Sequence, residues 1–150
     1  MVVAEDGRVT RTDLFAVRIL TREGRESAVA AAGYETDFGK IREIRAWLIQ
    51  PSGKFTSYGN DSVIDEADLD DVYNESRVKR ISARNEAEAG SVFGYMIVSE
   101  SRPFFNQSMW YFQGIDPVLS SKLTLTLPAG WRARRSSLSR RSSAWCEGSI

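Results

Sequence analysis

The sequence of 150 residues contains no histidine and only one cysteine, Cys146. A disulfide within the chain is therefore excluded, as are a zinc site of the usual Cys and His kind and a Cys–His nucleophilic pair. Cys146 would need a neighbouring base to become a nucleophile, and no histidine exists for that role. We therefore expect no catalytic residue, no metal site and no cofactor, and we predict that this chain is not an enzyme.

Long hydrophobic runs are missing as well. No run approaches the roughly 18 apolar residues of a membrane-spanning helix. The first residues, Met1-Val2-Val3-Ala4, lead directly into Glu5-Asp6-Gly7, without the basic and apolar regions of an export signal. We expect a soluble chain with no membrane span. The lack of disulfides is compatible with a periplasm and with a cytosol, so the sequence does not assign a compartment.

The charge is balanced overall but unevenly distributed. Five of the 20 basic residues and one of the 20 acidic residues lie in 132–150, so residues 1–131 carry 15 basic and 19 acidic side chains, a net charge of −4. A mildly acidic body argues against binding of nucleic acid or an anionic membrane. The Arg/Ser-rich segment 132–150 lacks the interleaved aromatic residues of a nucleic-acid arm. We expect it to be a disordered tail after a domain at 1–131.

The stretch from Gly90 to Pro128 contains three consecutive strand-like runs, 90–99, 104–113 and 118–127. The last of these alternates, with leucines on one face. Three adjacent strands of this kind predict an antiparallel sheet with one buried side.

The preceding chain has the same character. Val9–Leu20 predicts a first strand, and Ser27–Tyr34 a second that pairs back on it, although its alanine run leaves a short helix as an alternative. Both faces of Ile41–Ile49 are partly apolar, which favours a central strand, with Ile41, Trp47 and Ile49 on one face. Pro51-Ser52-Gly53-Lys54 predicts a tight turn into a hairpin strand, Phe55–Tyr58.

The acidic segment Asp61–Asp71 is interpreted as an excursion over the surface, followed by a strand at Val72–Ser82. Segments of period 2 dominate and no strand–helix–strand alternation occurs. The fold class is therefore all-β, an antiparallel β-sandwich of roughly seven to nine strands. The residues expected in its core are Phe15, Val17, Leu48, Val92, Phe93, Ile97, Leu123, Leu125 and Leu127.

Two groups of acidic residues are candidates for a site. Glu43, Asp61 and Asp65 would offer carboxylates for an acid/base pair, but nothing in the sequence fixes two of them across a cleft. Asp61, Asp65, Asp68 and Asp70 lack the spacing, glycine and closing glutamate of an EF-hand calcium loop. We interpret the segment as a solvated acidic loop.

Aromatic residues provide the one candidate binding surface, formed by Trp110, Tyr111 and Phe112 together with Trp47. Such residues stack on sugars or extended peptides. Alternation along a strand sends Trp110 and Phe112 to one face and Tyr111 to the other. One of these two sets is expected to pack in the core.

Six pieces of the sequence, in this order, resemble a known family. They are Arg42–Lys54, Asp70–Glu75, Glu88–Tyr95, Phe112–Gln113, Pro117–Val118 and Leu123–Trp131. Together they are similar to the domain of unknown function 3857, a β-sandwich that precedes a transglutaminase-like domain of the cysteine-protease superfamily in many bacterial envelope proteins. The most specific pieces are the Pro-Ser-Gly hairpin, the Ala-Gly-Ser-Val-Phe-Gly-Tyr run and the closing Leu-Pro-Ala-Gly-Trp.

The resemblance implies a non-catalytic accessory domain. It would scaffold a transglutaminase-like domain in the same protein, or present a protein or peptide substrate to it, in the periplasm or cell envelope. The export signal and catalytic domain of such proteins are not in this sequence, and residues after Trp131 do not continue the family pattern. The alternative from the residues is a free-standing carbohydrate- or peptide-binding module that uses exposed aromatic residues; an enzyme in its own right is the weakest hypothesis.

Overall fold

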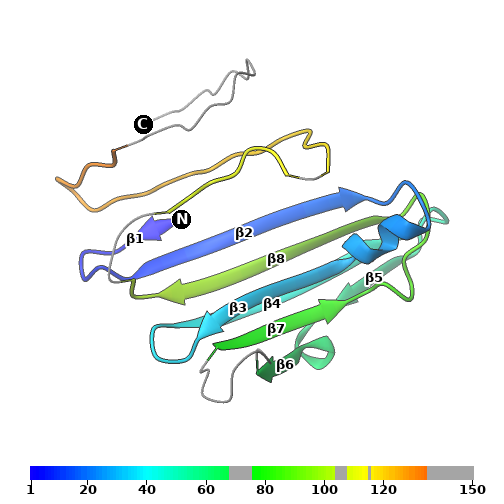
Figure 1. The fold of residues 1–150 in the computed structure, drawn as a ribbon, viewed down its shortest axis with the longest axis horizontal. Helices are drawn as coiled ribbons and strands as arrows, with labels where there is room; N and C mark the ends of the chain where they lie inside the picture. The colour runs from blue at the N-terminus through cyan, green and yellow to red at the C-terminus, as the bar shows by residue number, and fades with distance from the viewer. Residues whose placement is uncertain (68–75, 104–107, 115, 135–150) are drawn as a thin grey trace.

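The computed structural model describes residues 1–67, 76–103, 108–114 and 116–134, which form two antiparallel sheets (Figure 1). The five-stranded sheet has the order β1 (Val2–Val3), β2 (Val9–Arg18), β8 (Val92–Ser101), β4 (Gly39–Ile49) and β5 (Phe55–Tyr58). The three-stranded sheet has the order β3 (Val29–Glu35), β7 (Ser76–Ser82) and β6 (Ile64–Ala67). Two short 3-10 helices, η1 (Glu23–Ser27) and η2 (Asn60–Ser62), complete the described elements. The predicted all-β sandwich of seven to nine strands is confirmed.

Strand β4 is central, as its two partly apolar faces predict. It pairs with β8 along its whole length and with β5 at its end. A β-bulge between Ile41 and Glu43 changes the expected faces, because it turns Ile41 to the buried side with Ile44. The predicted hairpin is also confirmed, since the Gln50 amide donates to the Lys54 carbonyl at 2.9 Å and Gly53 has a φ of 84°.

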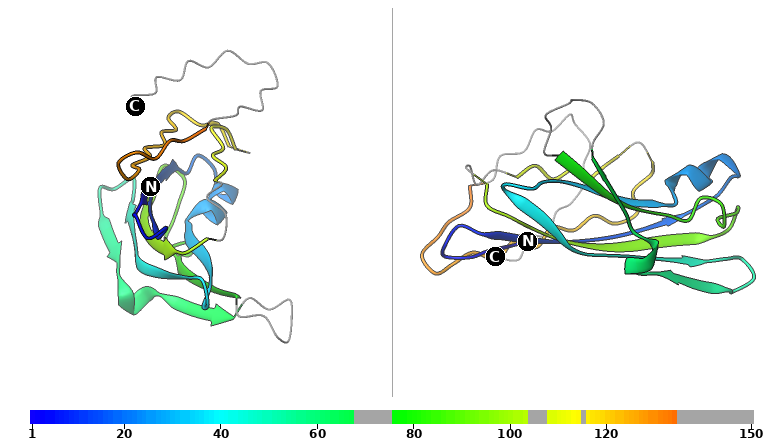
Figure 2. Two further views of the ribbon diagram at one scale, coloured as in Figure 1. Left: turned by 90° about the vertical axis from the view of Figure 1, so that its left-hand side faces the viewer. Right: turned by 90° about the horizontal axis from the view of Figure 1, so that it is seen from below.

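The core lies between the two layers, where β3 and β7 pack over β4 and β8 (Figure 2). Leu48 and Phe93 of the five-stranded sheet are buried against Ala30 and Ile81 of the other. The alanines of β3 have weak strand propensity, but their small side chains allow close packing of the sheets. The position of β3 in this core therefore depends on packing between the two sheets more than on the strand propensity of its own residues.

Two expected arrangements in the three-stranded sheet are wrong. Strand β3 does not pair back on β2 but with β7, in register from Val29–Ser82 to Glu35–Ser76. The acidic segment is not only a surface excursion, because Ile64–Ala67 forms β6 against β7. Cross-strand charges explain this second result: the Asp65 carboxylate accepts a hydrogen bond from Arg77 at 2.9 Å. The rest of that segment and the start of the Val72–Ser82 strand, 68–75, lie outside the described residues.

Only part of the predicted core is buried. Leu48, Phe93 and Ile97 are confirmed as core residues, whereas Val17, Val92 and Leu127 are half-buried. The prediction is wrong for Phe15, Leu123 and Leu125, which are 45%, 41% and 38% exposed. The physical reason is that the three-stranded sheet packs mainly over β4 and β8, so nothing of comparable size covers β2 or the chain beside β1.

Two of the three strand-like runs between Gly90 and Pro128 are not strands in the part that the structure describes. The first run forms β8, but 108–113 forms no strand and 118–127 makes only a single parallel bridge, from Thr126 to Val2. Residues 104–107 lie outside the described chain, as does the tail from 135 to 150. An alternating pattern favours an extended chain, but a strand also needs a paired neighbour. The neighbour here, Met1–Val3, is too short to form a longer ladder with 118–127.

The uneven burial of the leucines predicts a large difference in their energetic roles. Leu48→Ala should lower the free energy of unfolding by about 2–5 kcal/mol, because it leaves a cavity in the interlayer core. Leu119→Ala should change it by less than about 0.5 kcal/mol, because this side chain is fully exposed. Urea denaturation of both variants measures the difference. Similar losses for the two would mean that residues near 119 belong to the core.

Candidate functional site

The candidate site is the face of the five-stranded sheet that points away from the three-stranded sheet, called here the outer face. Residues opposite one another on paired strands share a face, so the register identifies its members. Trp47 lies opposite Gly94, and Ile49 lies opposite both Phe55 and Val92. The intervening residues of β4, including Ala46 and Leu48, point inward and are buried.

Apolar side chains occupy much of the outer face. The apolar patch consists of Leu14, Ala16, Trp47, Ile49, Phe55, Val92, Met96 and Val98. Leu14 is 73% exposed and Phe55 is 62% exposed. An antiparallel sheet with one face in water normally presents polar residues there. A cluster of apolar side chains on such a face is typical of an interaction surface.

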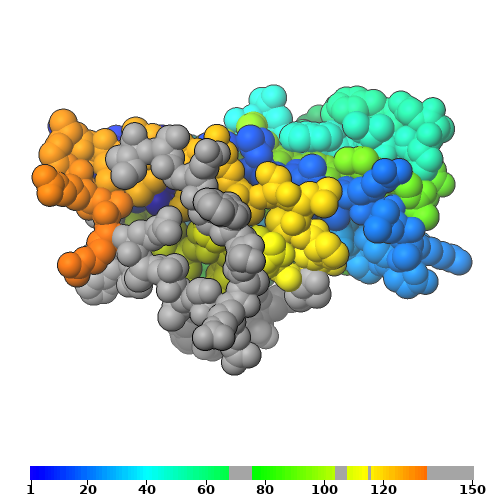
Figure 3. Space-filling model, turned by 90° about the horizontal axis from the view of Figure 1, so that it is seen from above, coloured from blue at the N-terminus to red at the C-terminus, as the bar shows by residue number. Residues whose placement is uncertain are grey.

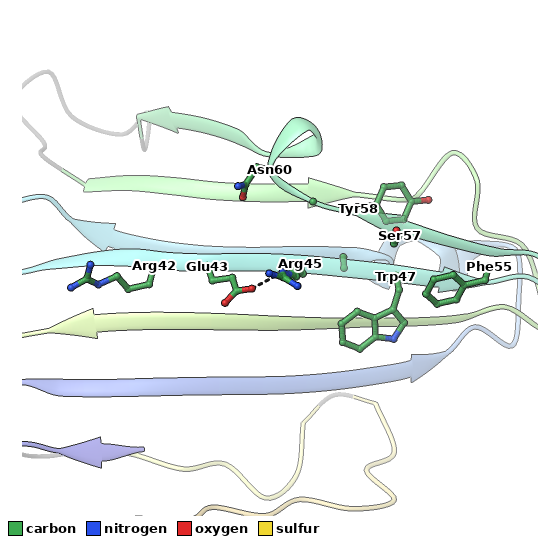
Figure 4. A pocket seen from close by; sticks show the side chains of 10 residues that line it. Arg42, Glu43, Arg45, Trp47, Phe55, Ser57, Tyr58 and Asn60 are labelled. Carbon is green, nitrogen blue, oxygen red and sulfur yellow. Dashed lines mark ion pairs between the residues drawn. The ribbon is translucent and has the colours of Figure 1, made fainter.

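Trp47 lies in the middle of this patch, where Gly94 leaves room for its indole. In Figure 4, which shows the outer face, the indole reaches from β4 across β8. A Cβ atom at position 94 would lie 2.6 Å from the Trp47 Nε1 and 3.2 Å from the Phe15 carbonyl oxygen. Only glycine allows this close approach, and the indole in turn covers the exposed backbone of the glycine. Trp47 is therefore both part of the patch and a structural cover for β8.

A shallow groove of about 560 Å³ borders the patch where β5 ends beside β4. Trp47 and Phe55 line it on one side, and Arg42, Arg45 and Asn60 line it on the other (Figure 4). The nearby hydroxyl of Tyr58 is buried and makes no hydrogen bond of good geometry with any residue that the structure describes. Burial, with the charge of Glu86 close by, raises the pKa of Tyr58 to about 12, so this hydroxyl stays neutral.

Cations dominate the charge of the outer face. Arg18 and Arg45 lie beside the patch, and Lys54 precedes Phe55 in the hairpin turn. Arg45 pairs with Glu43, whereas Arg18 and Lys54 make no ion pair with any described residue. The patch therefore has a rim of net positive charge, although residues 1–131 are acidic as a whole.

A second charged group fixes the far end of the same face. Glu100 accepts two hydrogen bonds from the Arg42 Nη2, at 2.8 and 3.0 Å, and Lys40 lies at 3.6 Å. The hydrogen bonds from Arg42, followed by its charge and that of Lys40, hold the pKa of Glu100 below its usual value. This carboxylate is part of a cross-strand ion pair between β4 and β8.

Of the three carboxylates considered for acid/base chemistry, Glu43 and Asp65 each have a cationic partner. Glu43 and Asp65 line a common depression of about 380 Å³, but Glu43 pairs with Arg45, and Asp65 with Arg77 at 2.9 Å. Burial acts to raise the pKa of Asp65, yet the hydrogen bonds from Arg77 and Tyr34 lower it overall. Asp61 lies in η2. In 1–67, 76–103, 108–114 and 116–134, no group of three acidic or Cys residues is placed to hold a metal ion.

The structure separates the predicted aromatic surface into two parts. Trp47 lies on the outer face, whereas Trp110 is half-buried beside β2, where its indole donates to the Ser121 hydroxyl at 3.0 Å. The Arg11 guanidinium lies 5.7 Å from the Trp110 ring centre, which ties this segment to β2. Phe112 packs edge-on against Trp110, and Tyr111 is 74% exposed.

Sequence reasoning included Trp47 among the candidates but missed the patch around it. Its other members are spread over four strands, from Leu14 to Val98, and only the register brings them together. One signal was present in the sequence: Gly94 interrupts a strand-like run, and a glycine inside a strand often marks a close approach by another group. That group is Trp47.

Comparison with known protein families matches residues 5–143 to a family described as a domain of unknown function with solved structure, DUF3857. The match extends past Trp131, which contradicts the expectation that the family pattern ends there. The chain belongs to the DUF3857 family. Comparisons with curated proteins and with solved structures found no match. None of the described helical segments of this DUF3857 chain is long and apolar enough to cross a membrane.

The contact between Trp47 and Gly94 predicts a specific coupling. Gly94→Ala should destabilise the protein by about 1–3 kcal/mol, because the added methyl group overlaps the indole. In a Trp47→Ala background the same change should cost less, since the closest contacts are gone. Chemical denaturation of the double-mutant cycle measures this. Gly33→Ala is the control, since its Cβ would meet nothing nearer than 3.9 Å; equal losses at both glycines would refute the contact.

The lowered pKa of Glu100 predicts a pH-dependent contribution to stability. A carboxylate whose pKa is lower in the folded state than in the unfolded chain stabilises the fold at pH values above its unfolded pKa. This contribution disappears as the pH falls through the lowered, folded-state pKa. Glu100→Gln should therefore reduce the thermal midpoint at neutral pH, and the gap to the unaltered protein should narrow in acid and in high salt. Glu5→Gln, at an exposed residue, is the control. A gap that stays constant from neutral pH into acid would contradict the ion-pair explanation.

Proposed function

We propose that this DUF3857 chain is a non-catalytic accessory domain that binds a protein partner through the outer face of its five-stranded sheet. The observation that carries the proposal is the apolar patch centred on Trp47. Burying such side chains contributes about 25 cal/mol for each Å² of apolar surface removed from water, and this favours association. The cations at Arg18, Arg45 and Lys54 favour a partner surface with acidic residues around an apolar centre.

The family resemblance suggests which partner this is. A transglutaminase-like domain in the same protein is the partner we propose, with the sandwich scaffolding it or presenting a protein or peptide substrate to it. A periplasmic or envelope location, in a bacterium, belongs to the same proposal. The absence of histidine supports a non-catalytic role for this chain, because acyl-transfer chemistry by a cysteine needs a paired base.

Calorimetric titration of the full chain with the transglutaminase-like domain encoded alongside it tests the proposal. We expect association with a negative heat-capacity change, which marks burial of apolar surface. Phe55→Ser should weaken binding by about tenfold or more, because it removes the most exposed aromatic side chain of the patch. Tyr111→Ser, at an exposed aromatic residue away from the outer face, should leave it unchanged. A reading frame that encodes no such domain, or equal binding by Phe55→Ser, would contradict the proposal.

A carbohydrate- or peptide-binding module is the second candidate. The observation in its favour is the exposure of Tyr111 beside Phe112, on a segment that Trp110 fastens to β2. Titration with chitooligosaccharides or with an extended synthetic peptide would then show binding. In that case the effects of the two variants are reversed, with Tyr111→Ser causing the loss and Phe55→Ser acting as the control.

A further inference from the structure

A stretch outside the eight strands extends the five-stranded sheet at its β1 side. The Thr126 amide donates to the Met1 carbonyl at 3.0 Å, and the Val3 amide donates to the Thr126 carbonyl at 3.0 Å. The amino group of Met1 donates to the Thr124 carbonyl at 2.8 Å. Residues 123–127, called here the edge segment, therefore run parallel to β1 and extend this sheet beyond it.

The other side of the edge segment has no backbone hydrogen-bond partner in the part of the chain that the structure describes. Its bonds to β1 use the backbone of Thr124 and Thr126. Backbone groups alternate in direction along an extended chain, so the N–H and C=O groups of Leu123, Leu125 and Leu127 point away from β1. No described residue forms a hydrogen bond with them. Seen from above, residues 118–134 (orange) lie at the surface of the molecule (Figure 3).

The edge segment carries none of the features that usually protect an exposed sheet edge. Proteins block such edges with charged residues, prolines or bulges. Residues 123–127 read Leu-Thr-Leu-Thr-Leu and contain no charge and no proline, while Lys122 and Pro128 stand just outside. Residues of high strand propensity and no charge on an open edge favour pairing with another chain.

The sequence of the edge segment indicates what the other chain is. Leu-Thr-Leu-Thr-Leu is the same read in either direction, so it is complementary to itself in an antiparallel pair. Pairing around Leu125 places Leu125 opposite the second copy's Leu125, and Leu123 opposite the second copy's Leu127. Thr124 then faces the second copy's Thr126. Cross-strand pairs of like apolar residues and of threonines stabilise a sheet.

We propose that residues 123–127 are a dimerisation edge, at which two copies of this chain pair antiparallel around a two-fold axis at Leu125. The pairing would satisfy the open groups of all three leucines with about six hydrogen bonds. A slip by two residues loses the central leucine pair and brings Lys122 or Pro128 into the ladder. The pairing uses the same edge of both copies around a two-fold axis, so this contact closes as a dimer rather than growing into a fibre.

The side chains support the same arrangement. The bridge between Val2 and Thr126 places the leucines on the face of Val3, which is buried, and the threonines on the exposed face of Val2. Leu123 and Leu125 are only partly covered within one chain. In the dimer the two rows of leucines lie side by side and cover part of each other's surface, which adds apolar burial to the hydrogen bonds.

Light scattering after gel filtration tests the proposal on the full chain, under reducing conditions so that Cys146 cannot link two copies. We expect a dimer that dissociates on dilution. Leu125→Lys and Leu125→Glu should each weaken it by about tenfold or more, because like charges meet at the axis. An equal mixture of the two variants should dimerise again, because opposite charges then meet.

The matched control is Leu119→Lys, which places the same charge on a fully exposed leucine outside the edge segment and should leave the dimer intact. Circular dichroism checks that each variant keeps its sheet content. Amide exchange gives a second measurement, since the amides of Leu123, Leu125 and Leu127 should exchange more slowly at high concentration. A chain that is monomeric at its highest soluble concentration would overturn the proposal. So would folded variants whose mixture stays monomeric, or assemblies larger than two.

This inference does not depend on the proposed function. The edge segment is separate from the apolar patch, because its leucines share the inner face with Val3, and Phe55→Ser leaves it unaltered. A failure to bind the transglutaminase-like domain would therefore not affect the dimer, and a monomeric chain would not affect the proposed function.

Discussion

The antiparallel ladder between β4 and β8 runs from Gly39–Ser101 to Ile49–Val92, and the positions of the other elements follow from it. Because side chains alternate along both strands, the ladder produces two surfaces at once. One row, with Leu48 and Phe93, builds the core against the three-stranded sheet. The other row carries Trp47 and its neighbours to the outer face. The bulge at Ile41 is what keeps both ends of β4 correctly oriented toward that core.

The small size of the three-stranded sheet explains most of the remaining exposure. A sheet of three strands packs mainly over β4 and β8, so the inward side chains of β2 are only partly covered. Part of the surface of Phe15 is covered by Tyr95, on which it stacks with ring centres 5.1 Å apart. The Trp110 ring similarly covers part of the Arg11 side chain. These contacts are individually modest, and they show how segments outside the strands attach themselves to an incompletely covered sheet.

The sequence predicts the strands well where pattern and pairing agree. The central position of β4 and the Pro51–Lys54 turn required only local chemistry, and both predictions were correct, although the bulge moves Ile41 to the other face of β4. The leucines at 123 and 125 have as good an alternating pattern as any strand, yet they lie half-exposed. Alternation indicates which residues share a face, but burial depends on a second layer that the pattern does not encode. For the same reason the sequence could not predict that Trp47 lies on the outer face while Trp110 packs beside β2, because other strands determine the surroundings of each.

The two surfaces left open by this fold use different physics, which makes their effects separable. The apolar patch would bind through side chains inside a basic rim, so screening by salt should slow association with an acidic partner while burial of Trp47 and Phe55 still holds the complex. The edge segment would pair through uncharged backbone groups and leucines, so there are no charges in it for salt to screen. Association at the patch should therefore vary with ionic strength, whereas pairing at the edge should not.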